Sequence, residues 1–172
     1  MLLKRRKFEM VSSEQIKKSF GEDSEWANES FRGGFELRFQ PRRATKNSAA
    51  YDLYSTLDLM LKPGEIAKIP TGFKIKMPKN EAFFIYIRSS LGSKDITLPA
   101  GVNIIDADYY NNEDNEGNFF IMIKNNSKKN FKIKQGDRIA QGVFMKYLTV
   151  DDEEEIENER TGGLGSTNKE VK

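Results

Sequence analysis

Hydrophobic and polar residues alternate along much of the chain in the pattern of half-buried β-strands. From Phe73 to Met77, apolar residues alternate with lysine, and this period of two places the apolar side chains on one face. Two other runs, 82–87 and 119–123, are continuously apolar and rich in Phe and Ile. Such runs could be buried helix segments, but their length and turn-rich flanks favour strands that are buried on both faces.

Turn signals separate these predicted strands at short intervals. They are Lys62-Pro63-Gly64-Glu65, Met77-Pro78-Lys79-Asn80, Asn125-Asn126-Ser127 and Gln135-Gly136-Asp137. Many short strands with such spacing predict an all-β fold, a sandwich or barrel of the jelly-roll type.

The two ends of the chain differ from this pattern. Residues 8–11 predict a short strand, and Ser12 to Gln15 form a capping box that predicts one short amphipathic helix ending before Gly21. Residues 21–34 are polar and indicate a linker or surface loop, whereas the segment after about Asp151 lacks apolar periodicity and indicates a flexible arm. The expected organisation is an N-terminal strand, helix and linker (1–34), a β domain (35–150) and a C-terminal arm (151–172).

Composition narrows the chemistry that the 172 residues can perform. The chain has no histidine and no cysteine, so histidine- and cysteine-based hydrolysis and histidine–zinc sites are excluded. Carboxylates, Lys, Tyr or a hard cation such as Mg²⁺ remain as the means of hydrolysis. The net charge of +2 gives no argument for nucleic acid, and no apolar stretch approaches the length of a membrane helix. We expect a cytoplasmic protein with no membrane partner, because no signal peptide and no disulfide framework are evident.

The strongest candidate for chemistry lies between Gly101 and Tyr110. An apolar strand leads into Asp106 and Asp108, which share a face at strand spacing, and aromatic rings follow. One carboxylate could then act in catalysis while the other holds local structure. A hairpin turn would explain the same residues equally well when the segment is taken by itself.

Four further segments carry groups suited to binding an anionic ligand. Each is weak by itself, and a surface loop is the simpler reading of the first. They are Arg88-Ser89-Ser90-Leu91-Gly92, Gly136-Asp137-Arg138-Ile139-Ala140-Gln141, Ala49-Ala50-Tyr51-Asp52-Leu53 and Arg160-Thr161-Gly162-Gly163-Leu164-Gly165-Ser166-Thr167.

In this order and spacing the five segments resemble the five motifs of the homotrimeric dUTPase family, over roughly 35–168. The insert 108–117 and the ending Gly-Ser-Thr-Asn-Lys look like a variant from Gram-positive bacteria or their phages. The resemblance implies a β jelly roll (the dUTPase-like β-clip), a trimer whose three subunits share three active sites, and hydrolysis of dUTP to dUMP and pyrophosphate.

The resemblance also implies a role for individual residues. Asp106 would deprotonate the water that attacks the α-phosphorus, and Tyr109 would lie under the deoxyribose and exclude a 2′-hydroxyl. Mg²⁺ would bridge phosphate oxygens, with Asp52 near its water shell. The remaining substrate-binding residues would be Arg88, Ser89, Ser90, Gly92 and Gln141 at the phosphates, Ala100, Val102 and Asn103 at the base, and Arg160, Leu164, Gly165, Ser166 and Thr167 on the arm.

Three positions depart from the family pattern, and they concern the base. Leu164 stands where the arm usually presents a Phe that stacks on the uracil. Asn103 replaces a usual Gly, and Ala100 replaces an Asn that often reads the uracil edge. The pyrimidine would then be recognised by backbone groups of 100–103 or by the Asn103 side-chain amide. The sequence does not decide between these two possibilities.

Two other functions compete with dUTP hydrolysis. One is a dUTPase-like regulator that binds nucleotide or a protein partner with little turnover, using residues 12–34 as its contact surface. The other is the related deamination of dCTP, which ranks low because no machinery for attack on an amino group is evident around the base-reading hairpin.

Overall fold

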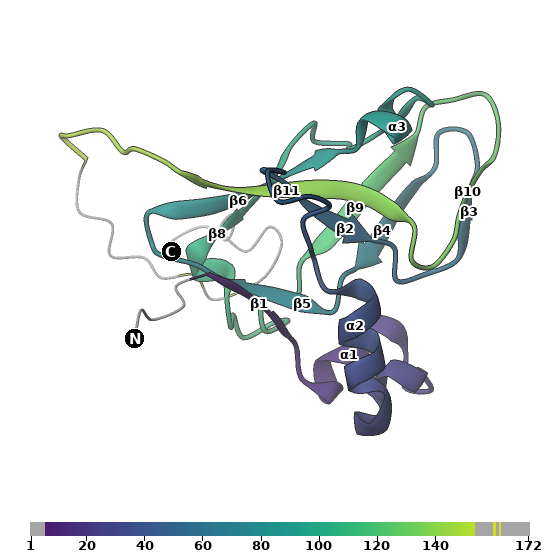
Figure 1. Ribbon diagram of the computed structural model, residues 1–172, viewed down its shortest axis with the longest axis horizontal. Helices are drawn as coiled ribbons and strands as arrows, with labels where there is room; N and C mark the ends of the chain where they lie inside the picture. The colour runs from purple at the N-terminus through teal and green to yellow at the C-terminus, as the bar shows by residue number, and fades with distance from the viewer. Residues whose placement is uncertain (1–5, 154–159, 161, 163–172) are drawn as a thin grey trace, which may run out of the picture.

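Short antiparallel strands form the body of the structure (Figure 1). The computed structural model describes residues 6–153 together with Arg160 and Gly162. Within this part, β2-β11-β6-β8 form the largest sheet, β4-β9-β7 form a second, and β1-β5 and β10-β3 are two-stranded. The strands are β1 (Lys7–Met10), β2 (Tyr51–Tyr54), β3 (Leu59–Leu61), β4 (Ile66–Pro70), β5 (Phe73–Lys76), β6 (Glu81–Ile87), β7 (Ile96–Thr97), β8 (Asn103–Asp106), β9 (Phe120–Asn125), β10 (Phe131–Ile133) and β11 (Arg138–Lys146).

Short helices connect and flank these strands. They are α1 (Ser13–Phe20), η1 (Glu25–Ala27), η2 (Glu29–Phe31), α2 (Arg32–Phe39), α3 (Ser89–Gly92) and η3 (Ala107–Tyr109). No helix in the described part of the chain is long and apolar enough to cross a membrane.

The predicted strand at Phe73 is confirmed as β5, with Phe73 and Ile75 buried and Lys76 exposed. The expectation that the run 119–123 is buried on both faces is wrong. In β9 the burial alternates, so that Ile121 and Ile123 are buried while Phe120 and Met122 are only half-buried. The second face of β9 remains accessible because it borders a cavity, which is described below.

The two larger sheets and β1 meet in an aromatic core. The rings of Phe83 on β6 and Phe119 beside β9 lie 6.3 Å apart. Phe8 on β1 contacts Phe83, Tyr51 and Phe144 with ring separations of 5.2 to 5.7 Å. Each such side chain contributes roughly 1.5–3 kcal/mol when it is fully buried, so β1 is an integral part of the fold.

The N-terminal helix begins as predicted, with Ser12 accepting a hydrogen bond from the Gln15 N–H at 3.1 Å. The reciprocal half of the capping box is missing. The Gln15 amide instead donates to Ser19 Oγ at 3.0 Å, and the Ser12 N–H donates to Glu116. The N-terminus of α1 is therefore capped partly by a residue from a distant loop.

The expectations of a linker over 21–34 and of β-structure from Phe35 are wrong. This region holds η1, η2 and α2, in which Phe35 and Phe39 are buried and pack against Trp26. Aromatic packing within the region explains the helices, because Gly33 and Gly34 give α2 a low helix propensity of its own.

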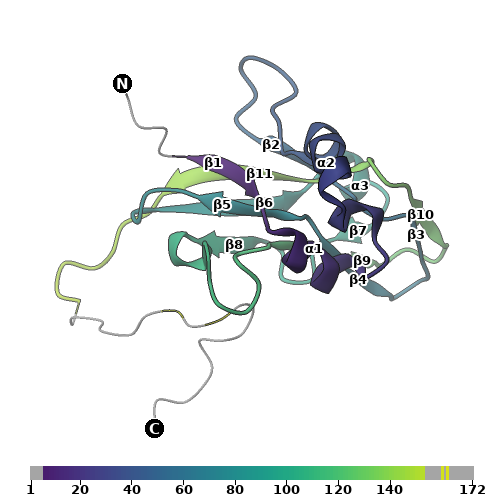
Figure 2. The ribbon, with the colours of Figure 1, turned by 90° about the horizontal axis from the view of Figure 1, so that it is seen from below.

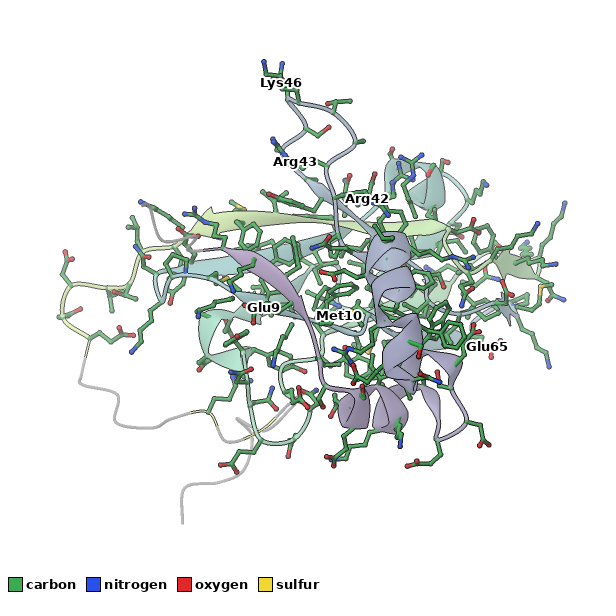
Figure 3. All side chains as sticks on the ribbon, turned by 60° about the horizontal axis from the view of Figure 1, so that its bottom comes forward. Glu9, Met10, Arg42, Arg43, Lys46 and Glu65 are labelled. Atoms are coloured by element: carbon green, nitrogen blue, oxygen red, sulfur yellow. The ribbon has the colours of Figure 1, made fainter. Side chains whose placement is uncertain are left out.

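The helical region packs directly on the β domain. Gly72, in the turn between β4 and β5, has φ +75°, and a Cβ there would lie 2.6 Å from Phe35 Cζ. Figure 1 shows α1 and α2 together below the strands, and Figure 2 shows the molecule from that side. Figure 3 shows the loop between α2 and β2 projecting from the body, with Lys46 at its tip. The Arg43 guanidinium folds back onto this loop, where it donates to the carbonyl oxygens of Lys46 and Ser48.

Candidate functional site

Two carboxylates lie where β8 gives way to η3. Asp106 ends β8 and is paired with Ala82 of β6, while Asp108 lies in the single turn of η3. Arg160 bridges them, with Nη2 2.8 Å from Asp106 Oδ2 and Nε 2.9 Å from Asp108 Oδ1. The sequence predicted that the two carboxylates share a face at strand spacing. In the structure both face the Arg160 guanidinium, but a helical turn rather than a continuous strand brings them together.

A cavity of about 290 Å³ opens beside Asp106. Six residues predicted to bind substrate or act in catalysis line it, and β9 and β4 complete its walls. The lining residues are Lys68, Ala100, Val102, Asn103, Ile104, Ile105, Asp106, Tyr109, Phe120, Met122 and Arg160. A mostly apolar hollow with a few polar groups at one side is typical of a small-ligand pocket.

Tyr109 is the most firmly held side chain at this cavity. Its residue is buried, and its hydroxyl accepts a hydrogen bond from Asn115 Nδ2 at 2.8 Å. The guanidinium carbon of Arg160 lies 5.6 Å from the ring centroid. Burial raises the pKa of the Tyr109 phenol above its usual value, against the opposing effects of Asn115 and Arg160, so the ring presents a neutral surface at physiological pH.

Sequence reasoning missed the contribution of β4 and β9 to the cavity. Lys68 lies over the ring of Phe120, with Nζ 4.1 Å from the centroid, and Met122 lines the same wall. The signal was the unbroken apolar run over 119–123, because its second face needs something to cover it. A bound apolar ring would provide that cover as well as a second sheet would.

The predicted phosphate-binding residues lie elsewhere. Arg88 follows β6 at the N-cap position of α3, which contains Ser89, Ser90 and Gly92, and both serines are exposed. On β6, Asp106 is paired with Ala82, six residues from Arg88. At 3.2–3.4 Å per strand residue this separation is roughly 20 Å.

Asp52 and Gln141 belong to the Arg88 end of the sheet. They are paired across β2 and β11, and Asp52 is buried between Arg88 and Arg138, each with a nitrogen 3.2 Å from a carboxylate oxygen. The expected partner of Asp52, the water shell of a metal ion, would have to share this carboxylate with both guanidinium groups.

The carboxylates do not form a cage for a metal ion. Among the described residues no three metal-ligating side chains of the His, Cys, Asp or Glu type gather in one place. The candidate residues Leu164, Gly165, Ser166 and Thr167 lie outside the described residues.

Comparison with known proteins assigns this arrangement to a family. The dUTPase family profile matches residues 39–168. A deoxyuridine 5′-triphosphate nucleotidohydrolase of Lactococcus lactis is 45% identical over 129 residues, which cover 74% of this chain and 86% of that protein.

Solved structures show the same fold. The dUTPase of Streptococcus mutans superposes with a TM-score of 0.66 at 31% identity, covering 84% of this chain and 98% of that one. A mutant dUTPase from phage phi11 of S. aureus, described as coordinating a structural Mg(II) ion, superposes with a TM-score of 0.56 at 27% identity. The match covers 69% of this chain and 91% of the phage protein. The predicted all-β jelly-roll class is thereby confirmed.

Proposed function

The chain belongs to the dUTPase family, and from this premise we propose that it hydrolyses dUTP to dUMP and pyrophosphate with the cavity beside Asp106 as its nucleoside pocket. The observation that carries the proposal is the lining of that cavity. It places a carboxylate, a buried Tyr ring and the 100–105 segment around one hollow of about 290 Å³, which suits a pyrimidine nucleoside.

The cavity divides into a sugar side and a base side. Tyr109 lies next to Asp106, so its ring would lie under the deoxyribose and leave no room for a 2′-hydroxyl. The base would extend along 100–103 toward Phe120 and Met122, where backbone groups and the Asn103 amide supply polar partners. Phe120 then provides an aromatic wall, which partly offsets the lack of an aromatic residue at position 164.

Asp106 would act as the general base. Its carboxylate takes a proton from a water molecule, the water oxygen bonds to the α-phosphorus, and the bond from that phosphorus to the bridging oxygen breaks to release pyrophosphate. The described structure supplies the base in a half-exposed position, with Arg160 beside it. Positioning and charge neutralisation would supply most of the rate enhancement.

One chain by itself does not bring the base and the phosphate-binding residues together. The separation of roughly 20 Å along β6 between Asp106 and Arg88 exceeds the length of a triphosphate by a wide margin. We propose that Asp106 and Tyr109 of one subunit face Arg88, Ser89, Ser90, Gly92 and Gln141 of another, in a homotrimer. The split of the candidate residues between two ends of one sheet supports this arrangement.

Mg²⁺ fits the donor set if the substrate carries most of its ligands. Mg²⁺ commonly binds through one or two carboxylates, water and substrate phosphates, so the absence of a carboxylate cage among the described residues agrees with this mode. Bound there, the ion would neutralise charge on the phosphates. Asp52, held between two arginines, would contact its water shell.

Hydrolysis assays with purified protein test the proposal. We expect release of pyrophosphate from dUTP in the presence of Mg²⁺, with little from dCTP, dTTP or UTP, and loss of this activity in Asp106→Asn. Binding of dUTP without turnover in the parent protein would refute hydrolysis and favour a nucleotide-binding regulator. Release of ammonia from dCTP would favour deamination instead.

A further inference from the structure

The loop 110–118 holds Tyr109 at both ends of the residue. Asn115 Nδ2 donates to the Tyr109 hydroxyl at 2.8 Å, and Asn112 Nδ2 donates to its carbonyl oxygen at 2.8 Å. The hydroxyl in turn reaches the carbonyl oxygen of Asn118 at 3.4 Å. Ring and backbone are therefore both fixed from the same loop.

The geometry of this loop defines the orientation of the Asn115 amide. Its Oδ1 accepts hydrogen bonds from the Gly117 N–H at 3.0 Å and from Asn112 Nδ2 at 2.9 Å, which leaves Nδ2 to face Tyr109. Gly117 has φ +86°, and a Cβ there would lie 2.6 Å from the Tyr109 carbonyl oxygen. The loop is thus closed tightly around Tyr109.

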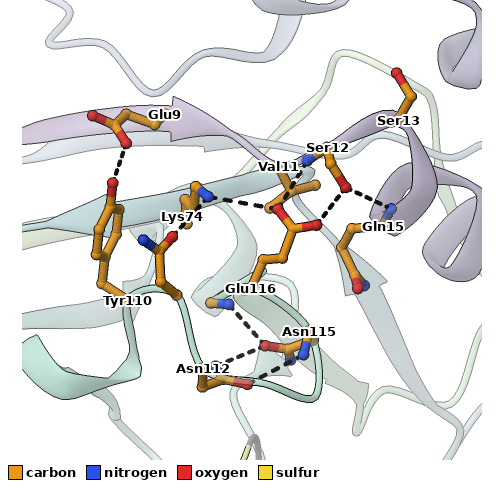
Figure 4. Close-up of polar contacts among 12 residues, drawn as sticks. Glu9, Val11, Ser12, Ser13, Gln15, Lys74, Tyr110, Asn112, Asn115 and Glu116 are labelled. Atoms are coloured by element: carbon orange, nitrogen blue, oxygen red, sulfur yellow. Dashed lines mark hydrogen bonds and ion pairs between the residues drawn. The ribbon is translucent and has the colours of Figure 1, made fainter.

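The N-terminal segment 7–20 fastens the loop from outside (Figure 4). Glu116 accepts hydrogen bonds from the Ser12 N–H at 3.0 Å and from the Ser12 hydroxyl. Asn118 Nδ2 donates to Ser19 Oγ at 2.7 Å, and the Tyr110 hydroxyl donates to Glu9. The segment precedes the 39–168 region that the family profile matches.

Lys74 on β5 reinforces this attachment. Its Nζ lies 2.7 Å from Asn111 Oδ1 and 3.5 Å from Glu116 Oε2. Burial by itself would raise the pKa of Glu116, but the hydrogen bonds from Ser12 and the charge of Lys74 outweigh it and lower that pKa. Glu116 is therefore ionised at neutral pH, at the N-terminus of α1, where a negative charge is favoured.

We propose that the N-terminal segment, through Glu116 and Asn115, is a positioning element that holds the Tyr109 ring and thereby sets the discrimination of this enzyme between deoxyribo- and ribonucleotides. The inference rests on the proposed function only in placing the sugar on Tyr109. The Tyr109 ring excludes a 2′-hydroxyl only if it is held rigidly. A displacement of a positioned group by about 1 Å is enough to change reaction rates by orders of magnitude.

The test compares kcat/KM for dUTP and UTP in Glu116→Ala, Asn115→Ala and Tyr109→Phe. We expect the dUTP-to-UTP ratio to fall about tenfold in each, mainly through a gain with UTP. Asn115→Ala and Tyr109→Phe remove the hydrogen bond that holds the ring, and Glu116→Ala removes the attachment of the loop that supplies this bond. Glu14→Ala, on an exposed residue of α1 that pairs with Lys18, is the matched control and should leave the ratio unchanged.

A double-mutant cycle separates positioning from a general loss of structure. In a Tyr109→Phe background the hydroxyl is absent, so adding Asn115→Ala should lower the ratio no further. An equal fall in both backgrounds would show that Asn115 acts on the loop in general and would overturn its role through Tyr109. Tyr109→Phe keeps the ring and tests the tether even if Asn115→Ala fails to fold.

Two further results distinguish the inference from the proposed function. If Tyr109→Ala leaves the ratio unchanged, the sugar-contacting role of Tyr109 is wrong. If Tyr109→Ala lowers the ratio but Glu116→Ala and Asn115→Ala do not, only the positioning role is overturned. Dissociation constants of dUMP and UMP, measured by calorimetry, give the same comparison if the parent protein shows no turnover.

Discussion

Arg160 Nη2 lies 2.8 Å from Asp106 Oδ2, so the residue proposed as general base is paired with a cation of its own chain. The same guanidinium holds Asp108 and lies near the Tyr109 ring. A triphosphate would compete with both carboxylates for Arg160. Binding of substrate would then free Asp106 to accept a proton while Arg160 turns to the phosphates.

Removing the ion pair between Arg160 and Asp108 should strengthen substrate binding, because Arg160 is then freer to contact the phosphates. Because an exposed ion pair is worth about 0.2–1 kcal/mol, we expect Asp108→Asn to lower KM for dUTP up to about fivefold. Steady-state kinetics at low ionic strength measure the effect. Asp152→Asn makes the same charge change at an exposed position and should leave KM unaltered; a higher KM in Asp108→Asn would argue against competition for Arg160.

Sites shared between subunits make a complementation test possible. Asp106→Asn and Arg88→Gln should each be inactive. Co-refolding the two variants in equal amounts should restore about a quarter of the parent activity, because about one site in four then combines an intact Asp106 from one chain with an intact Arg88 from another. Light scattering should give about three times the 19.7 kDa of one chain. Mixtures that stay inactive despite forming trimers would place the whole site within one chain.

The residue at position 164 lies outside the described part of the chain, but its chemistry still gives a prediction. Stacking of a base on an aromatic ring is worth about 1–3 kcal/mol, so Leu164→Phe should lower KM for dUTP about fivefold or more. Leu148→Phe, at an exposed leucine upstream of the arm, is the matched control. Unchanged kinetics in Leu164→Phe would show that the arm does not cover the base.

Tyr110 provides a spectroscopic test of the N-terminal attachment. The hydrogen bond to Glu9 raises the pKa of Tyr110 to about 12, with burial adding to the effect. A raised pKa means that the neutral phenol stabilises the fold below about pH 10, and this contribution is lost as the pH rises through 12.

Glu9→Gln removes the carboxylate, so the Tyr110 pKa should fall back toward about 10. The difference in tyrosinate ultraviolet absorbance between each protein and its Tyr110→Phe counterpart isolates this single titration. If the isolated titration is the same with and without Glu9, then the contact between β1 and the loop does not persist in solution.

Part of the fold was predictable because it depends on short-range pattern. The alternation from Phe73 to Met77 and the Ser12 cap are properties of a few neighbouring residues, and both appear in the structure. The helices η1, η2 and α2, which follow α1, were not predictable in this way. Their stability comes from rings packed across α1, η1, α2 and β5, while their local sequence contains two adjacent glycines.

The chemical groups could be read directly from the residues: a carboxylate and a Tyr on one strand-to-turn segment, arginines and serines suited to phosphates, and no histidine. Which of these groups meet depends on the folded arrangement of the sheets. This arrangement separates Asp106 from Arg88 along β6, adds Phe120 and Met122 to the cavity, and joins Glu116 to Ser12 across 104 positions of sequence. Such contacts depend on how strands pair and how sheets stack. They join residues that are far apart in the sequence, so they leave no periodic pattern in the residues that make them.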